Sequence, residues 1–314
     1  MKINILFICI LLTAIQGYSQ QEPCYGIYMF NHFAYNPGFA GTNNEISATA
    51  INRQQWAGFD GAPNTMGFSV EGLLKPFGVK SGIGVNLVQD KQGLNTSFQL
   101  EAAYSYRTEL AGGKLGIGLS LGLINLVAKG EFKAVDGAEQ DMAIPPLDQP
   151  KSAFNMNFGA FYKASNYYVG LSSTRLNEGN FKFVNQEGND ILLDYLKRHY
   201  YLTGGYRFRT KNPLIEIQPS SIIRFDGRTM QADINALGYY NKKFWGGLGY
   251  RIGANAIIIA GLELINGIKL SLAYELTTSK MIKGSPNTFE VLIQYGFKLS
   301  MDKTPDRYRS VRFL

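Results

Sequence analysis

Residue types that carry acid–base or nucleophilic chemistry are sparse in this sequence. His32 and His199 are its only histidines, and neither has a companion cysteine at a zinc-ligand spacing. His199 follows the acidic residues Glu187 and Asp194 in the sequence. A hydrolase embedded in a membrane could use such a histidine and carboxylate at the rim of its membrane domain, but no nucleophile motif accompanies them. The sequence therefore predicts no catalytic residues, no cofactor and no metal. A hydrolase that depends on His199 is kept as a third alternative.

Two other patterns resemble catalytic or ligand-binding motifs, but their sequence context does not support such a role. The glycine-rich stretch 113–122 is followed by no helix, so it does not fit a phosphate-binding loop. Glu187 and Asp190 form a carboxylate pair within a polar segment, where a solvated surface is the default interpretation. Neither pattern supports an enzyme.

The composition limits the class of protein. Of the 314 residues, 45% are apolar and only 18% are charged, whereas soluble domains carry about 25% charged residues. Beyond the N-terminus, no apolar run approaches the roughly 20 residues of a membrane helix. The chain is therefore either soluble or crosses a membrane as something other than helices.

The N-terminus indicates export. Lys2 precedes an apolar stretch over 3–15, and Gly17-Tyr18-Ser19 ends in a small residue, which predicts a signal peptide over residues 1–19. Cys24 follows Glu22-Pro23 rather than a small residue, so lipidation is not expected. It is the one cysteine of the mature chain, and no intramolecular disulfide can form. An exported chain without a basic helix is not expected to bind nucleic acid, despite its net charge of +7.

Period-two alternation organises most of the remaining sequence. Between 288 and 299, for example, apolar residues at odd positions alternate with mostly polar ones at even positions. This pattern predicts about fourteen strands separated by turn-rich pieces. We expect them to begin near Glu45, Asn64, Ser81, Thr96, Lys114, Ser152, Tyr167, Lys197, Leu214, Thr229, Lys242, Asn255, Gly267 and Asn287.

An all-β, antiparallel transmembrane barrel fits these strands better than a soluble sandwich. Segments of about ten alternating residues match the 9 to 11 that cross a bilayer at a barrel tilt, and bacterial barrels have even strand numbers. A sandwich would carry more Lys and Glu on its polar faces than the Gly, Ser, Asn and Ala found here. Aromatic residues near strand ends, such as Tyr106, Tyr201, Tyr240 and Trp245, are expected to form an interfacial girdle.

The expected organisation has four parts. A signal peptide covers residues 1–19, a leader or plug that does not alternate covers 20–44, the outer-membrane barrel covers 45–300, and a basic tail covers 301–314. The two longest connections, 129–151 and 175–196, are separated by two strands, so both lie at the same face. Long loops of outer-membrane barrels are external, which places the N-terminus of the barrel in the periplasm.

Charged residues on the polar strand faces would be costly in lipid but not in a lumen. Mixed signs predict ion pairs between neighbouring strands, whereas an ion pathway or a docking surface for a polar ligand are the functional interpretations. These residues are Glu101, Arg107, Glu109, Arg207, Arg209, Glu216, Arg224, Asp233, Lys243, Arg251, Glu263, Lys269, Glu275, Glu290 and Lys298.

The first third of the chain resembles a known family. The motifs are Tyr28-Met29-Phe30-Asn31, Asn36-Pro37-Gly38-Phe39-Ala40-Gly41, and the run from Arg53 to Thr65 that contains Gln55-Trp56 and Gly61-Ala62-Pro63. Together they are similar to the PorP/SprF family of the type IX secretion and gliding apparatus of Bacteroidota. The family usually has Ala where this chain has Gly38. Weaker similarity continues through 82–93 and 104–107.

The resemblance implies a non-enzymatic outer-membrane barrel. Its implied partners are an exported surface protein or adhesin, held by its C-terminal domain, and periplasmic secretion-ring lipoproteins, some of them peptidoglycan-binding. A passive diffusion porin in the outer membrane is the alternative. The motif residues are candidates for partner binding: Tyr28, Asn31, Asn36, Pro37, Gly41, Arg53, Gln55, Trp56, Gly61, Pro63 and Thr65.

Overall fold

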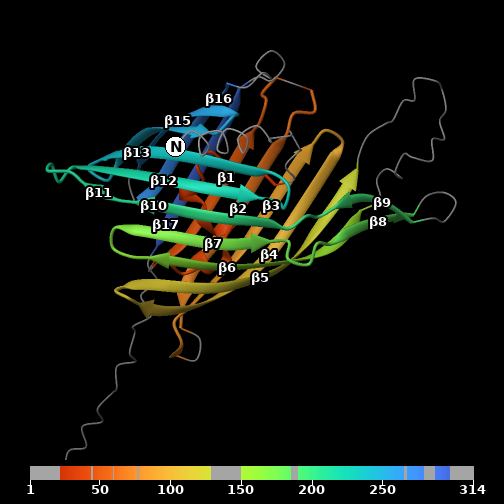
Figure 1. The fold of residues 1–314 in the computed structure, drawn as a ribbon, viewed down its shortest axis with the longest axis horizontal. Helices are drawn as coiled ribbons and strands as arrows, with labels where there is room; N and C mark the ends of the chain where they lie inside the picture. Colours follow the sequence, from red (N-terminus) through yellow and green to blue (C-terminus); the bar gives the residue numbers. More distant parts are fainter. Residues whose placement is uncertain are drawn as a thin grey trace, which may run out of the picture.

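A computed structural model of the chain describes residues 22–43, 45–58, 60–75, 78–128, 150–184, 190–264, 267–278 and 287–297. The expected signal peptide, the basic tail and most of the connection 129–151 lie outside these residues. The described part forms a barrel of long tilted strands (Figure 1). No helix among the described residues is long and apolar enough to cross a bilayer.

Fourteen antiparallel strands close into a ring, as the alternation predicts. Consecutive strands pair in order, β17 pairs with β1, and β10 pairs with β12 across the connection that contains β8 and β9. Every expected strand start lies within two residues of an observed one. The wall strands are β1 (Ile46–Gln54), β2 (Asn64–Leu74), β3 (Ser81–Gln92), β4 (Asn95–Leu110), β5 (Gly113–Ala128), β6 (Lys151–Lys163), β7 (Tyr167–Thr174), β10 (His199–Tyr206), β12 (Ile215–Phe225), β13 (Met230–Tyr240), β14 (Phe244–Arg251), β15 (Asn255–Glu263), β16 (Ile268–Thr277) and β17 (Thr288–Phe297).

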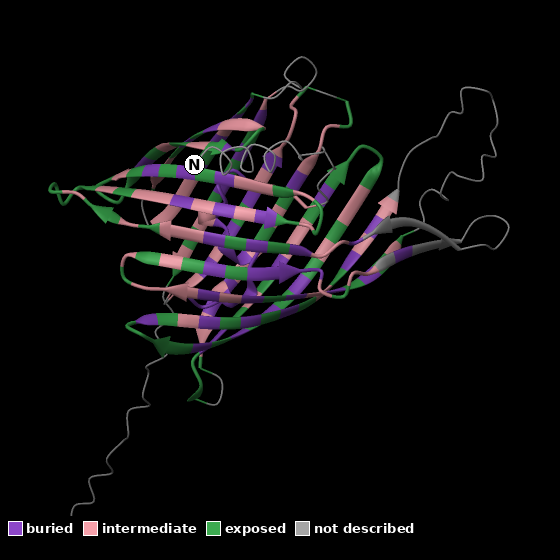
Figure 2. Ribbon diagram, viewed as in Figure 1, coloured by how far each residue is buried: buried purple, intermediate pink, exposed green. Residues whose placement is uncertain are grey.

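The two faces of the wall differ as a membrane barrel requires. In β4 the outward Tyr104 and Tyr106 are 48% and 49% exposed, whereas the inward Ser105 between them is fully buried. The same striping of buried and exposed residues runs along most of the strands (Figure 2). Because the outward residues are mostly large and apolar, the exposed surface suits hydrocarbon rather than water.

The two ends of the barrel are distinct. The connections β1–β2, β5–β6, β7–β10, β12–β13 and β14–β15 share one end by antiparallel parity, and we name it the hairpin end. The other, named the turn end, carries the tight connections after β2, β4, β6 and β13, and there β1 begins and β17 ends. The polypeptide chain therefore both enters and leaves the barrel wall at the turn end.

The connection 175–196 is not the loop that the sequence suggests. It contains a two-stranded sheet, β8 (Asn180–Val184) and β9 (Asp190–Tyr195), which projects beyond the ring (Figure 1). Phe181 is buried in a cluster with Ile124, Leu126, Ala153 and Leu196. This contact with the extended ends of β5 and β6 stabilises a hairpin whose alternation is too short to stand out in the sequence. A two-residue strand, β11 (Phe208–Arg209), also pairs with β12 at the turn end.

The aromatic girdle is only partly as expected. Tyr106 and Tyr240 face outward at strand ends, but Tyr201 and Trp245 are buried inside the barrel. Their rings pack on leader aromatics, Tyr201 on Tyr35 at 5.2 Å and Trp245 on Phe30 at 5.6 Å between centroids. Alternation fixes which residues share a face, but it does not reveal that a segment inside the barrel will cover an inward ring.

Candidate functional site

The lumen contains the segment 22–43, which we name the leader. It makes three short 3-10 turns, η1 (Tyr28–Phe30), η2 (His32–Ala34) and η3 (Pro37–Phe39). Ile27 and Tyr28 are fully buried. The main apolar core lies between the leader and the inner wall, and it joins Tyr25, Ile27, Tyr28 and Tyr35 to wall residues that include Tyr201, Ile222, Leu237, Ile257, Ile259 and Leu292.

The leader runs along the lumen from one end to the other. At the hairpin end, the Glu22 carboxylate lies 3.2 Å from the Arg175 guanidinium and accepts a hydrogen bond from the Thr174 hydroxyl at 2.9 Å. At the turn end, the Gly41 N–H donates to the Glu71 carboxylate at 2.6 Å. The leader therefore descends through the barrel before the chain turns back to form β1.

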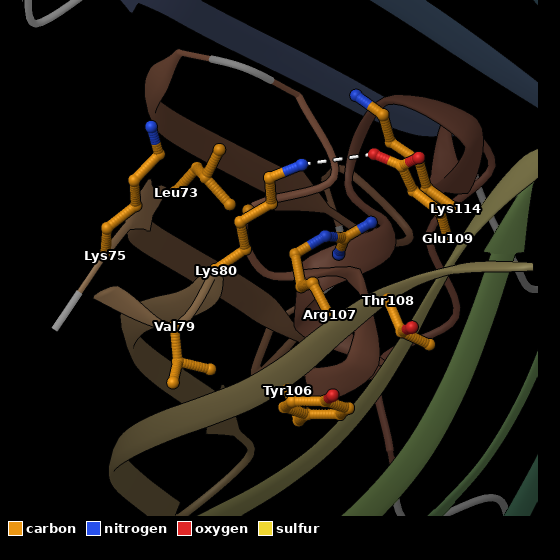
Figure 3. A pocket seen from close by; sticks show the side chains of 10 residues that line it. Leu73, Lys75, Val79, Lys80, Tyr106, Arg107, Thr108, Glu109 and Lys114 are labelled. Carbon is orange, nitrogen blue, oxygen red and sulfur yellow. Dashed lines mark hydrogen bonds and ion pairs between the residues drawn. The ribbon is translucent and has the colours of Figure 1, made fainter. Parts of the chain in front are cut away.

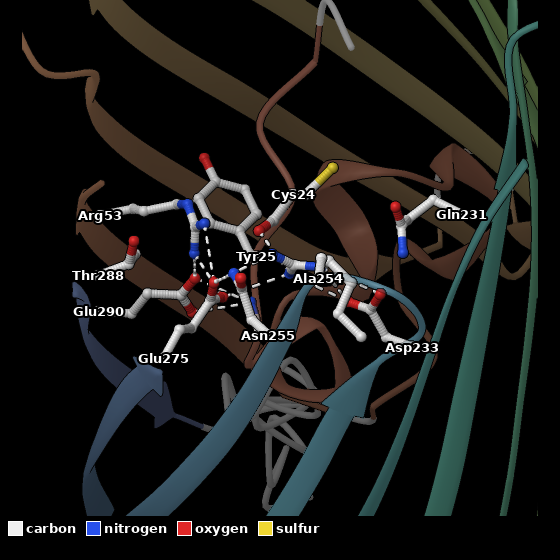
Figure 4. A network of polar contacts seen from close by, with 12 residues as sticks. Cys24, Tyr25, Arg53, Gln231, Asp233, Ala254, Asn255, Glu275, Thr288 and Glu290 are labelled. Atoms are coloured by element: carbon white, nitrogen blue, oxygen red, sulfur yellow. Dashed lines mark hydrogen bonds and ion pairs between the residues drawn. The ribbon is translucent and has the colours of Figure 1, made fainter. Parts of the chain in front are cut away.

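Charged side chains of the wall gather around the first part of the leader, and Arg53, Asp233, Glu275 and Glu290 are seen close to Cys24 and Tyr25 (Figure 4). We name this group the luminal clasp, and its members are Arg53, Arg224, Asp233, Arg251, Glu275 and Glu290. Arg251 lies 3.1 Å from Asp233 and 3.0 Å from Glu275, Arg224 lies 3.0 Å from Asp233, and Arg53 lies 2.7 Å from Glu275 and also pairs with Glu290. With three cations and three anions, the clasp is neutral.

Side chains of the clasp bind backbone groups of the leader. The Glu290 carboxylate accepts from the N–H groups of Gly26 at 2.8 Å and Ile27 at 3.1 Å. Arg251 donates to the Cys24 carbonyl at 3.0 Å, and Arg224 to the Tyr25 carbonyl at 3.3 Å. Backbone N–H and C=O groups in a dry interior must have hydrogen-bond partners. The clasp side chains supply the partners that water would otherwise give to this irregular segment.

The electrostatics at the start of the leader favour a charged Glu22. Burial alone would raise the pKa of its carboxyl, but the nearby Arg175 and His199, together with hydrogen bonds from Tyr201 and Thr174, hold that pKa below the ordinary value. His199 itself is buried, with Nδ1 3.0 Å from the Lys197 carbonyl. His199 thus lies beside a leader carboxylate.

The inner wall is shaped to admit the leader at the turn end. A Cβ added at Gly82 would lie 1.9 Å from the Ala40 carbonyl oxygen, and one added at Gly118 would lie 2.4 Å from the Pro37 carbonyl carbon. The small residues that alternate along β3 and β5 therefore make room for the leader.

Replacement of Gly82 by alanine should loosen the leader. Overpacking of this kind costs about 1–3 kcal/mol, so we expect roughly tenfold faster cleavage of the leader by chymotrypsin, which cuts after its aromatic residues. Gly238→Ala is the matched control, because the nearest atom to its added Cβ is 3.8 Å away. Equal cleavage rates for the wild type and both variants would show that Gly82 does not hold the leader in place.

Side chains and leader together fill the barrel at the level of the clasp. Asp233 and Glu275 are fully inaccessible, and Arg53 is 2% exposed. Inward charges around a water-filled channel would be hydrated, so this exposure indicates a filled interior at the level of the clasp. The described residues also contain no cluster of three or more His, Cys, Asp or Glu side chains placed to hold a metal ion.

Comparison with known proteins identifies the family of this chain. A family model described as "Type IX secretion system membrane protein PorP/SprF" matches residues 17–295. The chain belongs to the PorP/SprF family. No curated relative matches it.

The PorP/SprF barrel resembles the fold of a solved monoaromatic hydrocarbon channel. The CymD monoaromatic hydrocarbon channel is 9% identical with a TM-score of 0.50, and the match covers 86% of this chain and 92% of that one. The toluene transporter TodX of P. putida is 10% identical with a TM-score of 0.45, covering 84% and 92%. The KdgM porin is 11% identical with a TM-score of 0.37, covering 80% and 99%. At 9% identity the likeness to CymD concerns the fold alone.

The family motifs of the leader lie inside the PorP/SprF barrel. Tyr28 shares a hydrogen bond with Ser220 at 3.1 Å, and Asn31 is buried. The Asn36 side chain accepts from the Gly38 N–H at 2.9 Å and donates to the Ala160 carbonyl at 3.0 Å, which fixes η3 against β6. Pro37 begins η3, and Gly41 has a φ of 69°, which a residue with a side chain rarely adopts.

The second motif builds the β1–β2 hairpin beside the clasp. Arg53 is a clasp member, and the Gln55 N–H donates to the Pro63 carbonyl at 2.9 Å. The Trp56 N–H donates to the Thr288 hydroxyl at 3.4 Å, Gly61 has a φ of 75°, and Thr65 donates to Asp90 at 2.7 Å. These contacts give the motif a structural role, and partner binding by its residues stays a prediction.

Sequence reasoning missed three residues that hold the leader. Glu22 anchors its start, Tyr201 donates a hydrogen bond to Glu22, and Asn235 donates to the Gly26 carbonyl at 2.9 Å. Asn235 follows Asp233 on the same inward face of β13, which is the signal that could have identified it. The five clasp members other than Arg53 were expected only as general lumen charges.

Proposed function

We propose that this barrel is an outer-membrane component of the type IX secretion and gliding apparatus that works by binding proteins. Its ligands are the C-terminal domain of an exported surface protein or adhesin, periplasmic lipoproteins of the secretion ring, or both. The family match supports the assignment to this apparatus. The barrel interior filled at the level of the clasp is the observation that favours binding over solute transport, because a barrel that solutes cannot cross acts through its surfaces.

The two ends suit different partners. We infer that the hairpin end is external, since it carries the projecting β8–β9 sheet and the long connection after β5, and long loops of outer-membrane barrels are external. The turn end then faces the periplasm. An exported protein would meet the hairpin end, whereas ring lipoproteins, including any that bind peptidoglycan, would meet the turn end.

Affinity purification of the tagged protein from outer membranes in a mild detergent tests this function, with co-purifying proteins identified by mass spectrometry. We expect a large surface protein, ring lipoproteins, or both to be enriched over an unrelated tagged barrel. A variant in which a short glycine–serine linker replaces 179–195 should lose the surface protein and keep the lipoproteins. A barrel that purifies alone and conducts ions would support the porin alternative instead.

A further inference from the structure

A cavity of about 650 Å³ opens at the turn end, beside the last residues of the leader. It lies between Gly41, the β2–β3 turn, and the adjoining ends of β4 and β5. Its polar lining includes Lys75, Lys80, Arg107, Glu109 and Lys114, with Leu73, Val79 and Tyr106 among the apolar residues (Figure 3). Its volume falls in the range of roughly 300–1,000 Å³ typical of ligand-binding pockets.

Positive charge dominates this cavity. Four of its lining side chains are cationic, and Glu109 is the only carboxylate among the described residues that line it. Glu109 pairs with Lys80 at 3.1 Å, and both side chains are more than half exposed. Such a surface pair is weak and easily exchanged for another anion. The cavity therefore presents excess positive charge to a ligand.

Arg107 provides a second, independent indication of a ligand. Its side chain is 94% buried, since only 6% is exposed. Nη1 donates to the Ala40 carbonyl at 2.9 Å and to the Thr42 hydroxyl at 3.0 Å, whereas Nη2 is buried and has no hydrogen-bond partner among the described residues. No described carboxylate oxygen lies within 4.0 Å of the Arg107 guanidinium, and the buried Glu71 is the carboxylate whose charge acts on it. Nη2 is thus a buried donor without a partner, which is costly, and an anionic group that reaches it would satisfy it.

The basic character extends around the turn end. Charged residues in the described turns and strand ends there are Lys75, Lys80, Lys114, Lys163, Arg207, Arg209, Lys211, Lys242, Lys243 and Lys269, against Glu45, Glu109, Glu216 and Glu263. The corresponding positions at the hairpin end carry nearly balanced signs, namely Glu22, Asp60, Asp90, Glu178 and Asp226 against Lys91, Lys151, Arg175, Lys197, Arg198 and Arg228. The turn end therefore attracts acidic molecules.

We propose that this cavity binds an acidic peptide segment of a periplasmic protein, whose carboxylates pair with Arg107, Lys80 and Lys114. The mixed apolar and cationic lining suits a peptide that carries both kinds of side chain. The outward-facing Tyr106 brings the cavity to the outer edge of the wall. A phospholipid still fits less well, because the Arg107 guanidinium is on the inner face, in contact with leader carbonyls, while acyl chains must stay outside. The proposal rests on the proposed function, and it names the chemistry of its periplasmic partner.

Fluorescence anisotropy with the full-length protein in a neutral detergent tests this site. The probe is a fluorescein-labelled oligoglutamate peptide, and its oligoglutamine twin is the uncharged control. We expect the acidic peptide alone to bind, and Arg107→Gln to lower its affinity about tenfold or more. The double variant Lys80→Gln/Lys114→Gln should cause a similar loss and does not disturb the leader contacts of Arg107.

The matched control removes two charges from the same end outside the cavity, as Lys211→Gln/Lys242→Gln. Equal losses in the control and cavity variants would overturn the site in favour of diffuse attraction by the rim. Equal binding of both peptides, or displacement of the acidic peptide by phosphatidylglycerol micelles at low concentration, would also overturn it. If purification from membranes recovers periplasmic lipoproteins but the peptide does not bind, the inference fails while the proposed function stands.

Discussion

The full-length barrel should be silent in a planar lipid bilayer, and a variant lacking residues 22–40 should conduct ions. Eight-stranded barrels are filled by their own side chains, whereas 16- to 18-stranded porins enclose an aqueous channel. A ring of fourteen strands is nearer in size to the second group, so its own side chains leave part of the interior empty. In this protein the leader occupies that space. We expect conductance to rise roughly tenfold or more over the baseline once the leader is removed.

Loss of the leader should not prevent formation of the ring. The wall strands pair through their own backbones, and the clasp charges, which are now buried, would face water in an open lumen. Heat modifiability on SDS gels would check that the variant folds. A synthetic peptide of residues 22–43 should restore silence, whereas a scrambled peptide should not. A folded but silent deletion variant would show that wall side chains alone close the barrel, and a conducting wild type would support the porin alternative.

Arg251→Met should strongly destabilise the barrel. Arg251 pairs with Asp233 and Glu275, both fully inaccessible, and its side chain is 6% exposed. Breaking a buried ion pair on one side leaves an uncompensated charge and costs about 3–5 kcal/mol. The same variant frees the Cys24 carbonyl of the leader. Urea unfolding in detergent micelles, followed by tryptophan fluorescence, would measure the loss.

A double variant separates charge balance from packing. Arg251→Met/Glu275→Gln removes one cation and one anion and leaves the clasp neutral, so it should be more stable than Arg251→Met alone. Lys80→Met is the control, because it breaks a pair in which both partners are more than half exposed, and such pairs contribute little. If Arg251→Met and Lys80→Met lower the stability equally, the clasp is not a structural element of the barrel.

Sequence alone determined the wall of this protein. Period-two alternation is a local property, since each strand must present one apolar and one polar face whatever its neighbours are. The fourteen strands and their starts follow from it, as do the inward charges of the clasp. Three of the charges expected in the lumen, Glu109, Arg209 and Lys243, are instead exposed at the turn end, because strand ends reach beyond the closed ring. The small residues on one face of β3 and β5 likewise indicate a crowded interior. The motifs before residue 66 identify the family.

Tertiary structure alone decided what the lumen contains. The leader has no periodicity, because its backbone is paired by side chains from distant strands rather than by a ladder. Its anchors come from the whole ring: Arg53 in β1 meets Glu290 in β17, 237 residues away, and Arg251 in β14 donates to the carbonyl of Cys24. The ring must close before these groups come within reach of one another. The clasp, the buried Tyr201 and Trp245, and the cavity beside Arg107 therefore depend on long-range closure that no local pattern records.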